Sequence, residues 1–276
     1  ASPFTPATAR KFLISPGDSN EELAQALLGH VLETAKVRGI SSVHFLFTDE
    51  AVLRNSALIH RIGCQFHWSN QGYRDFRDFL ESLTAKRRKE ILRERRKVNE
   101  AGIRIRRRSG DELSTEDWVR FHSLYRGTFE KHANFPALTL AFFQAIGKTM
   151  GDRLLVVEAL SGEIVVASAF FMVGQNTLYG RYWGADEEVP ALHFEVCYYQ
   201  GIEFAIERGL AVFEPGAQGE HKISRGFLPV RTHSYHWIGH QGFRDAIARH
   251  VILENQQMES YIRSCEARSP YRVAAC

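Results

Sequence analysis

The densest group of residues that could do chemistry lies in one segment, residues 214–229. Its three glycines permit sharp or left-handed turns and leave backbone amides able to meet a ligand. A carboxylate or an imidazole can act as a general base there, and two cations can hold an anion. The polar candidates are Glu214, Gln218, Glu220, His221, Lys222 and Arg225, with Gly216, Gly219 and Gly226 between them. The alternative interpretation is a solvated loop with ordinary turn glycines.

A second group lies just upstream, on a predicted strand and the helix that follows it. Alternation along residues 179–184 places Arg181 and Trp183 on one face of the strand. An arginine beside an aromatic ring can bind a carboxylate or a phosphate with two hydrogen bonds. His193 and Glu195 begin an otherwise apolar helix, where a buried carboxylate would suit a general base. The alternatives are an Arg181 paired with a surface carboxylate and a Glu195 with a purely structural partner.

The spacing of the remaining candidates argues against a metal enzyme and against a serine hydrolase. His233 and His236 fall on opposite faces of a strand if the alternation holds, and His221 has no Cys or second His at a ligand spacing. No G-x-S-x-G motif surrounds Ser224 or any other serine. We therefore expect no metal in the site.

Length and composition limit the kind of protein. The chain has 276 residues, of which 44% are apolar, so it can bury a large core. No apolar run approaches the roughly 20 residues that span a bilayer. The four cysteines are scattered singly, without C-x-x-C spacing, which favours a reducing compartment. We expect a cytoplasmic protein without a membrane span. Because the chain begins at Ala1 without Met, we also expect a fragment or a processed product.

Positive charge is concentrated between residues 84 and 108. Twelve Lys or Arg stand there against three Glu, a local charge of +9 in a chain whose net charge is +3. The basic side chains surround the apolar stripe of a predicted long helix that ends near Gly102. Charge of this kind suits the backbone of RNA, including tRNA, or a phosphorylated lipid. A solvated helical face is the alternative.

The pattern of elements predicts an α/β fold. Helices are expected over 20–38, 49–59, 79–102, 116–132, 136–147, 192–207 and 243–263, and strands over 43–47, 64–68, 103–106, 153–159, 163–173, 176–183, 211–214 and 232–239. Residues 32–40 match residues 202–210 in class at most positions, each time ending a helix that leads into a strand. This weak repeat predicts two related α/β units, 1–70 and 71–276, the first lacking its beginning.

Three blocks of the sequence resemble a bacterial family described as peptidoglycan biosynthesis/recognition proteins or predicted N-acyltransferases. They are GRYWG, LHFEVCYYQGIEFAIERGL and EPGAQGEHKISRGFLPVRTHSYHW. The resemblance is specific in these blocks and runs from about Phe66 to the end of the chain. That family is related to the FemABX aminoacyltransferases of the GNAT superfamily, which pair two GNAT-like units and move an amino acid from aminoacyl-tRNA to a cell-wall precursor.

The resemblance implies two GNAT-like units with mixed, largely antiparallel sheets flanked by helices. It also implies an N-acyltransferase that moves an activated acyl or aminoacyl group from acyl-CoA or aminoacyl-tRNA to an amine. The acceptor would be a small molecule or a cell-wall precursor. The basic segment 84–108 would then offer a contact for tRNA.

Residue by residue, the resemblance assigns two kinds of role. The implied catalytic residues, among which one takes the proton of the acceptor amine, are Glu195, Glu214, Glu220 and His221. The implied substrate-binding residues are Arg181, Trp183, His193, Gly216, Gln218, Gly219, Lys222 and Arg225, with Lys222, Arg225 and backbone amides holding a phosphate or the developing oxyanion. Gly226 and Pro229 also match the family's pattern.

One departure from simple GNAT enzymes bears on the donor. Those enzymes bind the pyrophosphate of coenzyme A at a Gly-rich turn before a helix. Here the strand that ends near Trp183 is followed by Asp186-Glu187-Glu188, which would repel pyrophosphate. Aminoacyl-tRNA therefore stays open as the donor. Two other hypotheses are a non-catalytic binder of RNA or of an anionic cell-wall precursor, and a degenerate acyltransferase that serves as an interaction module.

Overall fold

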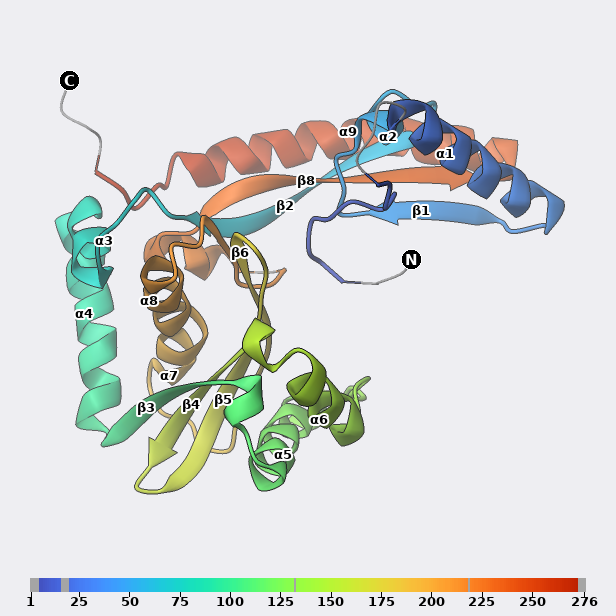
Figure 1. Cartoon of the computed structure of the whole chain (residues 1–276). Coiled ribbons are helices and arrows are strands. Elements are labelled where there is room, and N and C mark those ends of the chain that lie inside the picture. Colours follow the sequence, from blue (N-terminus) through green and yellow to red (C-terminus); the bar gives the residue numbers. More distant parts are fainter. Residues whose placement is uncertain (1–4, 16–19, 132, 218, 273–276) are drawn as a thin grey trace. The chain divides into compact units, whose positions relative to one another are not determined.

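The computed structural model describes residues 5–15, 20–131, 133–217 and 219–272 (Figure 1). The chain forms two compact units. Unit 1 comprises Ala1–Gln65 and Pro229–Arg268, and unit 2 comprises Phe66–Leu228 and Ser269–Cys276. The first break lies close to the predicted boundary at residue 70. The second break adds the C-terminal strand and helix to unit 1, because that strand pairs with the first strand of the chain.

Unit 1 is a small α/β unit. Its elements are α1 (Asn20–Val37), β1 (Ser42–Leu46), α2 (Ala51–Arg54), the first part of β2 (Ile59–Ser69), most of β8 (Leu228–Ile238) and α9 (Gln241–Glu266). Strand β1 pairs antiparallel with β8, so Phe45 stands opposite Tyr235. These two side chains pack with Leu53 of α2 and Leu28 of α1 to form the core of this unit. The predicted strand over 232–239 is confirmed as part of β8.

Unit 2 carries the larger sheet, in the order β2-β7-β6-β5-β4-β3. Neighbouring strands are antiparallel except β6 and β7, which are parallel. The predicted α/β class with a mixed, largely antiparallel sheet is confirmed. The remaining strands are β3 (Ile103–Ser109), β4 (Leu154–Ser161), β5 (Ile164–Val173), β6 (Thr177–Ala185) and β7 (Val212–Glu214), and the helices are α3 (Phe76–Ser82), α4 (Ala85–Glu100), α5 (Thr115–Lys131), α6 (Leu140–Thr149), α7 (Leu192–Phe194) and α8 (Gln200–Glu207), with short turns η1 (Gly110–Glu112), η2 (Gly151–Arg153), η3 (Glu195–Tyr199) and η4 (Glu220–Arg225).

Helices cover both faces of this sheet. Phe170 of β5 packs with Trp118 of α5 and Phe143 of α6. The next residue, Phe171, points to the opposite face, where a Cβ on Gly201 of α8 would meet its ring. A central strand buried on both faces accounts for the nearly continuous apolar runs of β4 and β5.

Two predicted helices are interrupted in the structure. The predicted helix over 79–102 is divided into α3 and α4, because Leu83 is extended and fully buried and the amide of Thr84 donates to the carbonyl of Pro270 at 2.9 Å. Helical periodicity continues across this point, so only the tertiary contact reveals the break. The predicted helix over 192–207 consists of α7, the π-helical turn η3 and α8.

A third prediction, the helix over 49–59, is also corrected. Helix α2 has four residues, and β2 starts at Ile59 rather than at residue 64. The hydroxyl of Ser56 donates to the carbonyl of Leu53 and accepts from the amide of Leu58, which turns the chain out of the helix.

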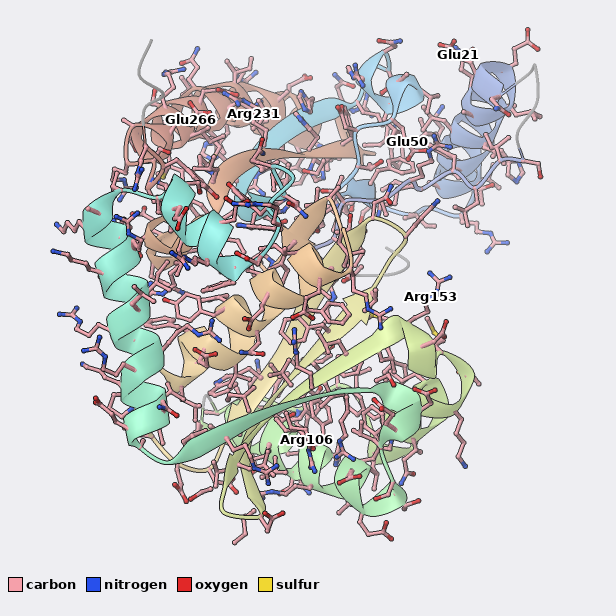
Figure 2. The ribbon with its side chains drawn as sticks, turned by 60° about the vertical axis from the view of Figure 1, so that its left-hand side comes forward. Glu21, Glu50, Arg106, Arg153, Arg231 and Glu266 are labelled. Carbon is pink, nitrogen blue, oxygen red and sulfur yellow. The ribbon has the colours of Figure 1, made fainter. Side chains whose placement is uncertain are left out.

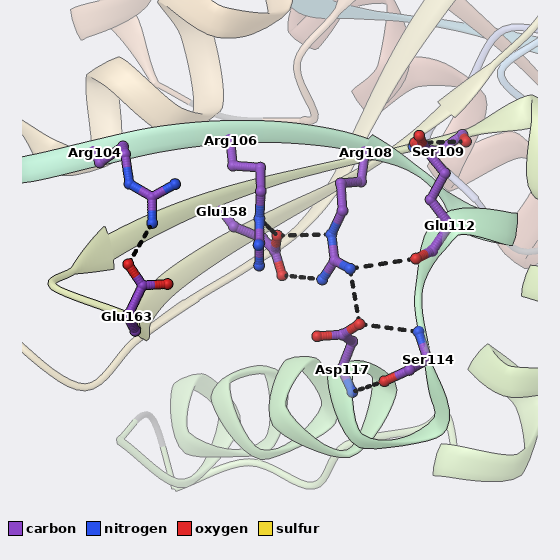
Figure 3. Close-up of polar contacts among 9 residues, drawn as sticks. All are labelled: Arg104, Arg106, Arg108, Ser109, Glu112, Ser114, Asp117, Glu158 and Glu163. Carbon is purple, nitrogen blue, oxygen red and sulfur yellow. Dashed lines mark hydrogen bonds and ion pairs between the residues drawn. The ribbon is translucent and has the colours of Figure 1, made fainter.

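The arginines of β3 are neutralised by acidic neighbours (Figure 3). Arg106 stands opposite Glu158 of β4, and both Arg106 and Arg108 donate to its carboxylate at 2.8–3.0 Å. Arg108 also donates to Asp117 of α5 at 2.8 Å. The Glu158 side chain is only 5% exposed. Arg104 pairs with Glu163 in the turn between β4 and β5, and the Glu163 side chain is 91% exposed.

We expect Glu158→Gln to lower the free energy of unfolding of unit 2 by about 3 kcal/mol, because it leaves Arg106 without a carboxylate in a largely buried site. Arg108 keeps Asp117, which limits the loss. Urea denaturation followed by circular dichroism measures the change. The matched control, Glu163→Gln, removes an exposed partner and should cost less than about 0.5 kcal/mol. Equal effects of the two substitutions would contradict this account.

Candidate functional site

The site forms where β6 and β7 separate. The two parallel strands pair only from Thr177 to Tyr179, and β6 continues to Ala185 without β7 beside it. Gly180 of β6 pairs with Phe171 of β5, and Tyr182 pairs with the adjacent Phe170. Arg181, between them, is therefore the extra residue of a β-bulge. Gly180 lies so close to the chain after β7 that a Cβ there would be 3.2 Å from Pro215 Cα. The separation and the bulge together create a small cavity.

This cavity has a volume of about 150 Å³ and an aromatic lining. Arg181 and Trp183 reach it from β6, and His193 and Tyr198 reach it from the helical segment after β6. The rings of Trp183 and His193 are 5.3 Å apart, and those of His193 and Tyr198 are 5.2 Å apart. The structure thus brings together three residues that the sequence singled out, Arg181, Trp183 and His193.

The π-helical turn η3 decides which side chains face the cavity. In a regular α-helix, residues five positions apart do not lie on one face, yet His193 and Tyr198 both line this cavity. The wider turn from Glu195 to Tyr199 supplies the extra residue. In the sequence, Tyr198 falls within the predicted, largely apolar helix over 192–207 and shows no sign of its place in the site. No feature of the apolar run marks the π-helical turn.

Glu195 points away from this cavity. Its carboxylate accepts two hydrogen bonds from Arg95 of α4, at 3.0 and 3.1 Å, and one from Gln200 at 2.8 Å. It lines a separate cavity of about 820 Å³ along α4 and β3. The side chain is buried and fully engaged, so its proposed role as a base gains no support from its surroundings.

The loop after β7 is shaped by its glycines. Gly216, Gly219 and Gly226 have φ of 97°, 115° and 96°, in the region that favours glycine. Between them, η4 buries Lys222, whose Nζ donates to the carbonyl of Gly216 at 2.8 Å. This bond holds the two ends of the loop together. Glu220 is exposed, Glu214 is half-buried, and Gln218 lies outside the described residues.

His221 connects this loop with the cavity. Its Nε2 lies 2.9 Å from the hydroxyl of Tyr198. The Tyr198 ring lines the cavity, whereas His221 is exposed at the molecular surface. Tyr198 therefore forms a bridge between the enclosed side of the site and the side open to solvent.

Arg225 is engaged in an ion pair with the basic helix. It is 6% exposed, and it donates to Glu94 of α4 at 2.6 Å and to the carbonyl of His221 at 2.7 Å. Its guanidinium lies 3.4 Å from the centre of the Phe194 ring. Arg225 thus supports the loop rather than facing an open site. The sequence does not mark Glu94 as part of the site, because one of three acids within a basic helix looks like part of a solvated face.

Burial sets the protonation of the site. It lowers the pKa of His193 to about 4, helped by the neighbouring cations. His221 is exposed as a residue, but partial desolvation of its imidazole, with the charges of Arg225 and Lys222, lowers its pKa as well. Both imidazoles are therefore neutral at pH 7 and can accept a proton. Burial lowers the pKa of Lys222 to about 8 and raises that of Tyr198, so both groups remain hydrogen-bond donors at neutral pH.

The basic segment 84–108 divides into two parts with different surroundings. The arginines of β3 are paired with carboxylates, as described above. On α4, an exposed set of cations forms no ion pair with any described residue; we call it the cationic face, and it consists of Lys86, Lys89, Arg93, Arg96 and Lys97. Figure 2 shows nitrogen-tipped side chains projecting outward along α4. The local charge excess is thus carried by the helix.

Two further searches concern the residues that the structure describes. Within them, no cluster of three or more His, Cys, Asp and Glu side chains could hold a metal ion. Nor does any described helix combine the length and apolarity needed to cross a membrane.

Comparisons with known proteins agree on a family and a fold. A FemAB-like family model described as peptidoglycan biosynthesis/recognition matches residues 1–273. The solved structure of FemX is similar with a TM-score of 0.56 and 15% identity, covering 89% of this chain and 84% of that one. L-PGS from Bacillus licheniformis gives 0.57 and 12%, covering 82% and 77% of the two chains.

A third similar structure is the C-terminal domain of a protein from Agrobacterium fabrum described as a lysylphosphatidylglycerol synthetase. Its TM-score is 0.60 at 11% identity, and the match covers 84% of this chain and 76% of that one. At such identities the three likenesses show a shared fold. No curated protein sequence matches the chain.

The low pKa of His193 predicts a pH dependence of stability. An imidazole that titrates near 6.5 in the unfolded chain and near 4 in the fold stabilises the protein fully above pH 6.5, and this contribution falls between pH 6.5 and 4. In His193→Phe, the free energy of unfolding should fall less steeply over this range than in the wild type. Urea titrations at intervals of half a pH unit measure the two slopes. His250→Phe, on an exposed position of α9, is the control, and identical slopes in all three proteins would refute the assignment.

Proposed function

The chain belongs to the FemAB-like family described as peptidoglycan biosynthesis/recognition, and from this premise and the geometry of the site we propose that it is an N-acyltransferase. It transfers an activated acyl or aminoacyl group to an amine, either on a small molecule or on a cell-wall precursor. One observation carries the proposal. Tyr198 lines the enclosed cavity with its ring and contacts the exposed imidazole of His221 with its hydroxyl.

The cavity and the loop have complementary tasks in this reaction. The acyl group occupies the cavity between β6 and Pro215, and the acceptor amine approaches from the side of His221. The amine nitrogen forms a bond to the acyl carbon, and the bond from that carbon to the donor's oxygen or sulfur breaks. The amine proton passes to His221, directly or through the Tyr198 hydroxyl, and His221 then gives a proton to the departing oxygen or sulfur. Lys222 and Tyr198 supply hydrogen bonds to developing negative charge.

The surroundings of β6 bear on the choice of donor. The three acids after the strand stay at the surface: Asp186 pairs with Arg120 at 2.6 Å, while Glu187 and Glu188 are exposed. They offer no site for the pyrophosphate of coenzyme A at this turn. The cationic face of α4 suits a polyanionic donor such as aminoacyl-tRNA. Acyl-CoA remains the other donor to be tested. Since both donors are cytoplasmic, we place the reaction in the cytoplasm.

Substitutions in the loop test the catalytic role. Calorimetry with acyl-CoA and aminoacyl-tRNA first identifies the donor, and acylation of a panel of amines then gives kcat. We expect His221→Ala and Lys222→Ala each to reduce kcat by about 10²–10³-fold, through loss of the base and of a hydrogen-bond donor. Lys148→Ala, at an exposed position of α6, is the control. If neither donor binds and neither substitution alters a measured reaction, the proposal fails.

The cationic face supports a second, separable test. We expect replacement of Lys89, Arg93, Arg96 and Lys97 by Gln to weaken tRNA binding, because each phosphate contact releases counterions. The slope of log K against log salt concentration should fall by roughly 0.7–0.9 for each lost contact. Arg104→Gln, which removes an arginine already paired with Glu163, is the control. A slope that is the same in all three proteins would exclude this face as the contact.

A further inference from the structure

We propose that the cavity at the β6 bulge selects an acyl group that ends in a carboxylate, which Arg181 binds. This inference rests on the proposed acyl transfer and names the class of group transferred: a short diacid joined through one carboxyl, or an acidic aminoacyl group. Three observations support it: the lack of an ion pair between Arg181 and any described residue, the lack of acids among the described residues of the cavity lining, and the size of the cavity.

Arg181 differs from the other arginines held within unit 2. Arg95, Arg108 and Arg225 each donate to at least one carboxylate within 3.1 Å. Arg181 is half-buried, and no hydrogen bond or ion pair joins it to any described residue. Its nearest aromatic contact is the Tyr179 ring, 5.9 Å away. A guanidinium drawn partly out of water without an anion is costly, and a bound carboxylate would offset that cost.

The bulge explains why the side chain has this position. As the extra residue of β6, Arg181 has no partner on β5 and its side chain leaves the regular alternation of the strand. Arg181 is thereby one of the residues that line the cavity. Bulges of this kind commonly redirect a side chain beside a functional site.

The charges around the cavity favour an anion over a cation. No Asp or Glu is among the described residues that line it. His193 is neutral at pH 7, and Lys222 adds positive charge behind Tyr198, 6.0 Å from its ring. Glu214, at the end of β7, is the one carboxylate whose charge acts on the pKa of Arg181, and it is not among the residues that line the cavity. The ammonium group of a lysyl side chain would lie near the positive charge of Arg181, with no acid among the described lining residues to pair with it.

The volume limits the group to a short one. About 150 Å³ is well below the roughly 300–1,000 Å³ of sites for drug-sized ligands. With about 30 Å³ for each water-sized group, it holds about five such groups. A four-carbon diacid unit is of this size, whereas a nucleotide or a long acyl chain is not.

Three small amides test the inference without a donor or an acceptor. N-methylsuccinamate carries the carboxylate, N-methylsuccinamide is its neutral isostere, and the N-methylamide of β-alanine is the cation. By calorimetry we expect the carboxylate to bind about 10- to 100-fold tighter than the neutral amide, and the cation not to compete. In Arg181→Gln this preference should vanish, while Arg181→Lys should keep part of it.

Controls separate a lost ligand contact from a lost fold. Arg208→Gln removes an exposed arginine that also lies over a ring, that of Phe204 at 5.5 Å, and it should retain the preference. Thermal unfolding checks that Arg181→Gln is folded. If the wild type binds the neutral amide as tightly as the carboxylate, or binds neither, the proposal is overturned.

The outcomes also separate this inference from the proposed function. Selective binding of the carboxylate without acylation of any amine would retain the anion pocket and reject acyl transfer. Conversely, efficient transfer of neutral acyl groups by both the wild type and Arg181→Gln would support the acyltransferase and overturn the role of Arg181.

Discussion

Two neighbouring charges on α4 hold the site together. Glu94 pairs with Arg225, and Arg95 pairs with Glu195. Because a charge removed from water requires an opposite partner, each of these pairs strongly restricts the segment that carries it. Arg225 belongs to the loop after β7, and Glu195 opens the π-helical turn after β6. One helix therefore sets the positions of both segments that approach the cavity.

The consequences extend to the residues of the candidate site. Arg225, fixed by Glu94, donates to the carbonyl of His221 and so determines where that imidazole lies. The Tyr199 hydroxyl also donates to Glu94, which anchors the residue beside Tyr198. The contact between Tyr198 and His221 is thus supported from both sides. A helix that presents cations to solvent on one face uses its opposite face to order the site.

Three departures from regular backbone converge on the cavity: the bulge at Arg181, the separation of β6 from β7, and the π-helical turn. A continuous parallel pairing would place β7 against the whole edge of β6, and a regular helix would turn Tyr198 away from His193. Each departure leaves space or redirects a side chain, and together they leave an enclosed volume beside a surface loop. The ladder between β4 and β5 also has one register shift, between Ala159 and Leu160, but neither residue lines the cavity.

The sequence by itself determined the α/β class, most of the elements, and the loop of glycines and charges, and it singled out Arg181, Trp183 and His193, which line one cavity. It could do so because apolar periodicity and glycine placement are local properties of the chain. The break between α3 and α4, the π-helical turn, the partners of Glu195 and Arg225, and the pairing of the β3 arginines were decided only by the tertiary structure. All of these except the π-helical turn depend on a residue distant in sequence: Pro270 for the break, Arg95 and Glu94 for the ion pairs, and Glu158 for β3. The local pattern shows that a charged side chain is present, but only the packed fold shows whether an opposite charge already forms an ion pair with it.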